Sequence, residues 1–223
     1  MFFEWFVVAN YLHNTNRRNV LMKQFSLLLC GIILISAASV AEQKRTSSEK
    51  GKKSVEKTNV AHGLVVIETS LGNIIVKLAD DKAPKHAANF RKLAKEGFYV
   101  GTTFHRVIPG FMIQGGDPNS KDDDRSNDGL GGPTYRIDAE IGLPHERGVI
   151  AAARQGDAVN PERKSNGSQF YITVAPAKFL DGQYTVFGKI MKGMDVVDKI
   201  VAVPRDRNDN PIEKVVLKKV NVK

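Results

Sequence analysis

Short apolar runs separated by glycine and polar turns dominate the chain from residue 64 onward. The runs 64–67 and 74–78 are rich in β-branched residues, and the polar stretch 69–73 between them indicates a β-hairpin. Later runs have similar length and composition, so each suits a single strand better than a helix. We expect these further strands over 103–108, 111–114, 148–153, 169–174, 186–190 and 215–222.

Two other segments have the spacing of amphipathic helices. The first begins at Ala83-Pro84, where a proline removes no intrahelical hydrogen bond, and Gly97 ends it. Its apolar residues at 87, 90, 93 and 94 fall on one face, and a second helix is expected over 193–200. Many short strands with two helices predict a mainly β domain, either an antiparallel barrel or a sandwich with helices at its ends.

The first 41 residues have the pattern of an export signal. From Met22, one lysine precedes the apolar stretch 25–35, and small residues then lead to Ala41. This order is typical of a secretion signal, so we expect cleavage after Ala41 and a periplasmic mature protein. The alternative is an uncleaved membrane anchor, but even when the stretch is extended to Val40 its roughly 16 residues are fewer than the ~20 that span a bilayer. Because Met22 opens a complete signal, 1–21 are consistent with an over-extended gene start.

Residues 42–62 are rich in Lys, Ser and Glu and contain few apolar side chains, which predicts a flexible basic linker. The folded domain is then expected over 63–223. The single cysteine, Cys30, cannot form a disulfide within the chain, and the five histidines show no zinc-ligand spacing. We therefore expect no metal and no other cofactor.

The formal charge of +9 raises the question of a nucleic-acid partner. More than half of this excess lies in residues 1–62, outside the expected domain. We therefore expect no nucleic-acid partner. We also expect a monomer without an integral membrane span once the signal has been removed.

Three motifs point to a function: FHRVIPGFMIQGGD at 104–117, SNGSQFY at 165–171 and FLDGQYTVFG at 179–188. In order and spacing they resemble the cyclophilin family of peptidyl-prolyl cis/trans isomerases, and the resemblance extends over about 64–222. Together with the export signal, it makes the chain similar to bacterial exported cyclophilins. The resemblance implies a closed eight-stranded antiparallel β-barrel capped by two α-helices. It also implies an enzyme that rotates X-Pro bonds in proline-containing polypeptides and so assists protein folding.

Rotation about X-Pro has a barrier of ~18–20 kcal/mol because amide resonance must be broken, yet no covalent bond need form. A fixed cationic donor aimed at the proline nitrogen favours the twisted state, in which that nitrogen is pyramidal and basic. By the family resemblance, Arg106 is this catalytic donor, and Gln114 contacts the substrate backbone. His105, beside the arginine, is expected to be structural, because isomerisation transfers no proton through a general base.

The resemblance also places further side chains against the substrate. Phe111, Met112 and Leu180 match the walls of the proline pocket, and Tyr171 stands where the family commonly has phenylalanine. Ala153 matches a small position that faces the peptide, where a larger side chain would obstruct it.

Three other expected substrate-binding positions depart from the family pattern. Phe179 stands where eukaryotic members have a tryptophan important for cyclosporin binding, and Tyr184 stands at a common histidine position. Arg154 replaces an asparagine whose backbone contacts the peptide, and the loop 155–164 is longer than the compact family version. These departures leave drug affinity and substrate preference open.

Two other classes of function also stay open. One is a proline-peptide binding or chaperone module with little catalytic activity, although a pure binder has no use for the donor at Arg106. The other is a tether that uses the basic linker at a membrane surface.

Overall fold

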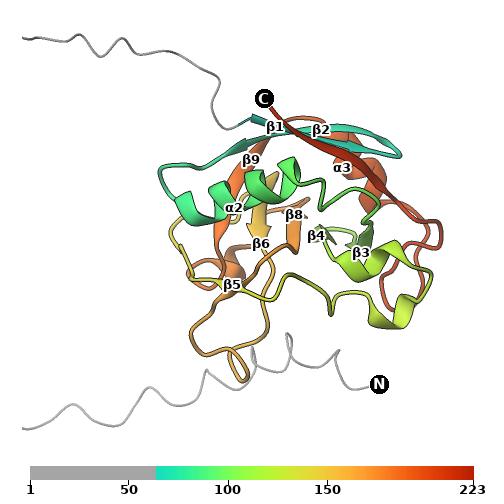
Figure 1. The fold of residues 1–223 in the computed structure, drawn as a ribbon. Helices are drawn as coiled ribbons and strands as arrows, with labels where there is room; N and C mark the ends of the chain where they lie inside the picture. Colours follow the sequence, from blue (N-terminus) through green and yellow to red (C-terminus); the bar gives the residue numbers. More distant parts are fainter. Residues whose placement is uncertain (1–63) are drawn as a thin grey trace, which may run out of the picture. The chain divides into compact units, whose positions relative to one another are not determined.

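The computed structural model describes residues 64–223 (Figure 1). The expected signal peptide and linker lie outside the described residues. The helices of the described part are α2 (Pro84–Lys95) and α3 (Met194–Val201), with short 3-10 turns at Pro118–Lys121, Arg125–Asn127 and Lys178–Leu180. The strands are β1 (Leu64–Thr69), β2 (Gly72–Leu78), β3 (Phe104–Ile108), β4 (Met112–Gly115), β5 (Arg136–Ile137), β6 (Val149–Ala152), β7 (Ser165–Asn166), β8 (Phe170–Thr173), β9 (Val186–Lys192) and β10 (Leu217–Val222).

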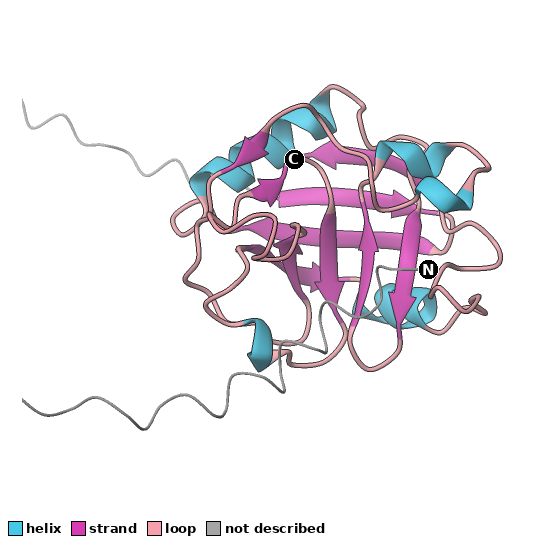
Figure 2. Cartoon of the chain, turned by 90° about the horizontal axis from the view of Figure 1, so that it is seen from below, coloured by secondary structure: helices cyan, strands magenta, loops and turns pink. Residues whose placement is uncertain are grey.

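Eight strands form one sheet in the order β10-β1-β2-β9-β6-β8-β4-β3, and every neighbouring pair is antiparallel. Strands β5 and β7 form a separate two-stranded sheet. Figure 2 shows the strands of the large sheet across the middle of the molecule, with helices at its margins. The prediction of a mainly β domain with two α-helices is confirmed for the described residues.

The prediction of a closed barrel is wrong, because the sheet is an open half-barrel. Its two border strands, β3 and β10, are joined by one isolated bridge, Thr103–Val216. Hydrogen bonds flank this bridge, from Phe104 N to Val215 O (2.9 Å) and from Leu217 N to Thr102 O (2.8 Å). Both strands begin directly after the bridge, and antiparallel strands that meet only at their first residues run apart from that point, so no ladder follows.

The main core packs against one face of the sheet. In β1 the burial alternates, and Val65 and Ile67 are fully buried, as a strand with one face on a core requires. Helix α2 contacts β9 and β10, whereas α3 contacts β2, β3 and β4. The predicted apolar face of α2 is buried as expected, at Ala87, Phe90, Leu93 and Ala94. Phe90 lies 5.5 Å from Phe170, ring centre to ring centre and edge to face, a favourable aromatic geometry.

No helix within residues 64–223 has both the length and the apolar character needed to cross a bilayer. In the same part of the chain, no three His, Cys, Asp or Glu side chains gather to form a metal site.

Candidate active site

Four side chains from four strands form a row on the face of the sheet opposite the main core. Arg106 on β3 pairs with Gln114 on β4, Gln114 pairs with Tyr171 on β8, and Tyr171 pairs with Ala151 on β6. Because paired residues of adjacent strands lie on the same face, these four side chains are neighbours in space. Sequence reasoning placed Arg106, Gln114 and Tyr171 at one site, and the structure brings them together.

A β-bulge in β3 turns Arg106 to this outer face. Phe104 pairs with Gly115, but Arg106 pairs with Gln114, so β3 has one extra residue, His105, between the two pairs. In a regular strand, residues two apart share a face. Here the bulge reverses that relation, and Phe104 is fully buried in the core while Arg106 is half-buried on the other side. The local backbone therefore re-aims the expected catalytic side chain.

The guanidinium of Arg106 forms no hydrogen bond and no ion pair with any other described residue. Its planar array of N–H donors is therefore available to a bound molecule. A cationic donor fixed on a strand and without an internal partner suits the stabilisation of a developing lone pair.

Gln114 is oriented by a second glutamine that sequence reasoning missed. Nε2 of Gln114 donates to Oε1 of Gln169 at 3.0 Å. Gln169 is buried, and its own Nε2 donates to the carbonyl oxygens of Gly129 (2.9 Å) and Gly131 (2.7 Å). This chain fixes the carboxamide of Gln114 and leaves its Oε1 free to accept an N–H from a peptide. The sequence held one signal for this role, because Gln169 lies inside the motif at 165–171. A glutamine that is buried there needs hydrogen-bond partners.

An apolar cluster that includes Ala151 and Tyr171 of this row is separate from the main core. It contains six of the expected substrate-binding residues. These six are Phe111, Met112, Ala153, Tyr171, Leu180 and Tyr184. A seventh, Phe179, is 52% exposed and packs its ring on Phe111 with 5.4 Å between ring centres. An apolar surface beside a positioned donor suits a small ring such as that of proline.

Tyr171 anchors one side of the cluster through His145. Its hydroxyl lies 2.9 Å from Nε2 of His145, and Nδ1 of His145 lies 3.0 Å from Oδ1 of Asp181. Burial lowers the pKa of His145 below its usual value, although the Asp181 carboxylate acts in the opposite direction. Burial also raises the pKa of Tyr171. Both groups are thus neutral at pH 7, and sequence reasoning named neither His145 nor Asp181.

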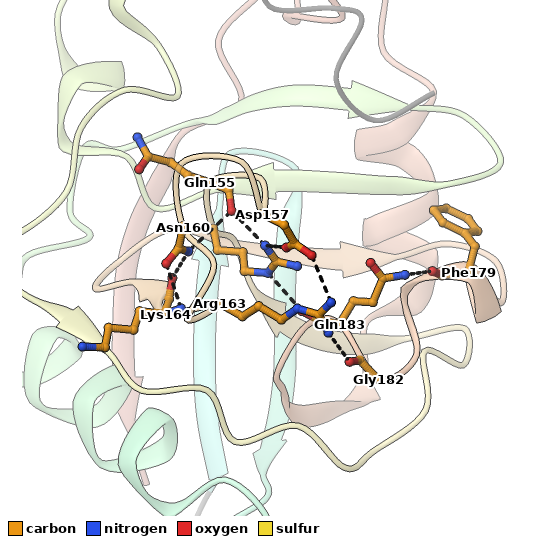
Figure 3. A network of polar contacts seen from close by, with 9 residues as sticks. Gln155, Asp157, Asn160, Arg163, Lys164, Phe179, Gly182 and Gln183 are labelled. Atoms are coloured by element: carbon orange, nitrogen blue, oxygen red, sulfur yellow. Dashed lines mark hydrogen bonds and ion pairs between the residues drawn. The ribbon is translucent and has the colours of Figure 1, made fainter. Parts of the chain in front are cut away.

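Arg154, expected among the substrate-binding residues, uses its side chain elsewhere. The side chain is only 3% exposed, and its guanidinium lies 4.4 Å from the ring centre of Tyr184. Nε donates to the carbonyl oxygen of Gln183 at 3.0 Å, within the network in Figure 3. The side chain of Arg154 is therefore not directed at a peptide, whereas the backbone beside it stays at the border of the apolar cluster.

His105 lies inside the bulge and is buried. Neither of its ring nitrogens has a hydrogen-bond partner among the described residues. Burial lowers the pKa of His105 to about 4, with the Asp117 carboxylate acting in the opposite direction. The ring is therefore uncharged at neutral pH, which suits the expected structural role.

A different trio has the outline of a hydrolytic triad. Nδ1 of His86 lies 2.7 Å from Oε2 of Glu140, and Nε2 lies 2.9 Å from Oγ of Ser165. Ser165 is only 1% exposed, so no acyl substrate reaches its hydroxyl. Glu140 also accepts the backbone N–H groups of Lys85 and His86 at the start of α2. This trio therefore ties the start of α2 to β7 of the small sheet and has a structural role.

Comparison with known proteins adds to this geometry. Residues 64–222 match the model of the family described as cyclophilin type peptidyl-prolyl cis-trans isomerase/CLD. The chain is 40% identical over 159 residues to peptidyl-prolyl cis-trans isomerase-like 1 of Neurospora crassa, covering 71% of this chain and 93% of the relative. It is 45% identical over 150 residues to a peptidyl-prolyl cis-trans isomerase of Acinetobacter baylyi, covering 65% of this chain and 75% of the relative.

Among solved structures, a cyclophilin type peptidyl-prolyl cis-trans isomerase of Cryptosporidium parvum matches with a TM-score of 0.65 at 32% identity. The match covers 72% of this chain and 97% of that one. The same parasite protein was also solved in the presence of the dipeptide Ala-Pro, and that structure matches with a TM-score of 0.64.

Proposed function

Because this chain belongs to the cyclophilin-type peptidyl-prolyl cis-trans isomerases, we propose that it accelerates X-Pro rotation without a covalent intermediate, with Arg106 as the central donor. The observation that carries this mechanism is the pairing of Arg106 with Gln114 on the outer face of the sheet, beside the apolar cluster. The bulge at His105 supports it, because it presents the free guanidinium on that face.

The proposed mechanism assigns one task to each part of the site. The apolar cluster holds the proline ring and excludes water from it. Oε1 of Gln114, fixed by Gln169, accepts a backbone N–H of the substrate and prevents the peptide from sliding. Arg106 donates to the proline nitrogen, whose lone pair becomes available only when the amide is twisted. This donor therefore binds the twisted state better than either planar isomer, which is the condition for catalysis.

We propose proline-containing polypeptides of the cell envelope as substrates. Two observations support this: the export pattern that ends at Ala41, and the Ala-Pro dipeptide used with the parasite relative. Proline isomerisation takes tens to hundreds of seconds without a catalyst and limits the folding of many chains, so an exported isomerase would assist folding there.

A protease-coupled assay with a short Ala-Pro peptide tests this function. The mature chain should raise the rate of cis-to-trans conversion in proportion to its concentration. A rate equal to the uncatalysed one, with a correctly folded protein, would contradict the proposed function.

A further inference from the structure

The side chain of Arg154 makes a set of contacts that all end within its own loop or on the segment 179–184. Besides the bond to Gln183, its Nη1 donates to the carbonyl oxygen of Gln155 at 2.9 Å. Nη1 also lies 2.6 Å from Oδ1 of Asp157. The guanidinium face covers Tyr184, a favourable cation–π geometry. A cation that is 3% exposed and has all these partners is fixed in one position.

Asp157 extends these contacts to a second arginine. Its Oδ2 lies 2.9 Å from Nη2 of Arg163, and Nη1 of Arg163 donates to the carbonyl oxygen of Gly182 at 2.9 Å. Asp157 thus lies between two guanidinium groups, and each of these groups reaches one carbonyl of the pair Gly182 and Gln183 (Figure 3). The Asp157 carboxylate thereby keeps both guanidinium groups within hydrogen-bond reach of the segment 179–184.

The loop that carries this acid is itself built to hold its shape. Asn160 is 4% exposed; its Nδ2 donates to the carbonyl oxygen of Lys164 at 2.8 Å, and its Oδ1 accepts from Lys164 N at 3.1 Å. Arg163 has a φ of 56°, in the left-handed region that a residue other than glycine rarely adopts. Such a conformation persists only when the surroundings enforce it. Arg163 N donates to the carbonyl oxygen of Asn160 at 3.0 Å, and its side chain is held by Asp157 and Gly182.

The segment held in this way carries part of the active site. Leu180 and Tyr184 belong to the apolar cluster, and Phe179 packs on Phe111. Within the segment, Nε2 of Gln183 donates to the carbonyl oxygen of Phe179 at 2.8 Å, so a displacement at Gln183 is passed to Phe179.

We propose that Arg154, Asp157 and Arg163 form an arginine clamp that positions the segment 179–184 for peptide binding. Arg154 is then a positioning residue, and its side chain is not a ligand of the peptide. This proposal rests on the proposed function for its kinetic consequences, although its effect on the free protein does not. It gives the long loop 155–164 a role, as the element that holds one wall of the site.

The test compares Arg154→Ala and Asp157→Asn in the otherwise unchanged chain, well below the melting temperature of each variant. Both should raise KM for an Ala-Pro peptide about fivefold and change kcat by less than about twofold, because the wall contributes equally to planar and twisted states. The double variant should have the same KM as Arg154→Ala, because both substitutions disrupt the same network and their effects do not add. Arg154→Lys should recover little, because an ammonium has no Nε donor for Gln183. Arg91→Ala, which breaks the ion pair between Arg91 on α2 and Asp80 in the preceding loop, is the matched control.

A second readout needs no catalysis. The methyl signals of Leu180 in the free protein should shift in both clamp variants and stay in place in Arg91→Ala. The two readouts separate the possible failures. If the wild type shows no isomerisation but the Leu180 signals shift, the proposed function fails and the clamp stands. If Arg154→Ala raises KM while Asp157→Asn leaves KM and the Leu180 signals unchanged, Arg154 contacts the peptide directly and the clamp is refuted. Unchanged KM and signals in both variants refute it as well.

Discussion

The hydroxyl of Tyr171 lies 2.9 Å from Nε2 of His145, and the two rings are stacked at an interplanar angle of 10°. Nδ1 of His145 faces the Asp181 carboxylate, so it carries the proton, and Nε2 accepts from the tyrosine. This chain of hydrogen bonds joins β8, in the centre of the site, to the segment that carries Phe179 and Leu180. A phenylalanine at this position would leave Nε2 of His145 without that donor.

Tyr171→Phe should therefore destabilise the fold while keeping the wall of the site. The buried Nε2 of His145 loses its donor, which costs about 1–3 kcal/mol in the free energy of unfolding. The aromatic ring remains, so kcat/KM should change only a few-fold. Urea unfolding measures the first effect, with Tyr135→Phe as a control, because that hydroxyl bonds to Asn89 in a more exposed place. Equal losses in the two variants would contradict the role given to His145.

Stability should fall as the pH drops below about 6.5, the ordinary pKa of histidine. Burial lowers the pKa of His86 and His145, and it lowers the pKa of His105 to about 4. The folded state therefore binds protons less readily than the unfolded state in this range. Stability is fully present above pH 6.5 and is lost as the pH falls through the folded pKa values.

His105 should dominate this pH dependence. A shift from about 6.5 to about 4 corresponds to on the order of 3 kcal/mol across that interval. Urea unfolding at several pH values between 8 and 4 measures the slope, and His105→Gln should make it shallower. A free energy of unfolding that is constant from pH 7 to pH 5 would show that these histidines are not buried as neutral groups.

If the export signal is cleaved as predicted, the mature protein should begin at Glu42. The small residues that end at Ala41 form the expected cleavage site after an apolar stretch. Mass spectrometry of the protein purified from the cell envelope measures its N-terminus. A chain that still begins at Met1 or Met22 would favour the anchored alternative.

Phe111→Ala should weaken peptide binding and lower the catalytic efficiency, kcat/KM, together. The ring of Phe111 forms part of the proposed wall of the proline pocket, which planar and twisted substrates both contact. It also packs on the ring of Phe179. Its removal should thus raise the Kd for an Ala-Pro peptide and lower kcat/KM by about the same factor. Phe98→Ala, which removes a ring packed against the main core, is the control and should change stability and leave the Kd unaltered. An unchanged Kd in a folded Phe111→Ala protein would exclude this residue from the wall.

The strands were predictable where burial on one face imposes a pattern, as in the hairpin of β1 and β2. Each predicted run contains a strand of the large sheet or overlaps it closely, because apolar residues mark the core. Strands β5 and β7 have only two residues each and therefore show no periodicity. The open border between β3 and β10 was equally invisible, because the extent of a ladder between distant strands depends on the course of the whole sheet.

The residues of the candidate site could be predicted from the motifs, but the residues that position them could not. Arg106 and Gln114 lie within one motif, whereas Gln169 reaches Gly131 across 38 positions and His145 reaches Tyr171 across 26. Such partners are fixed by the fold and have no local signal. The bulge at His105 is similar, because an extra residue in one strand is defined only against its partner strand.

The most direct test of the central claim is the isomerisation rate of an Ala-Pro peptide in the presence of Arg106→Ala, measured by exchange NMR. The Kd for the same peptide is titrated separately. Loss of a charged donor at the twisted amide should remove ~3–4 kcal/mol of transition-state stabilisation, or a few hundredfold in kcat/KM. The Kd should change much less, and Arg106→Lys should recover little because an ammonium lacks the planar fork. Isomerisation near the wild-type rate by a folded Arg106→Ala protein would contradict the account.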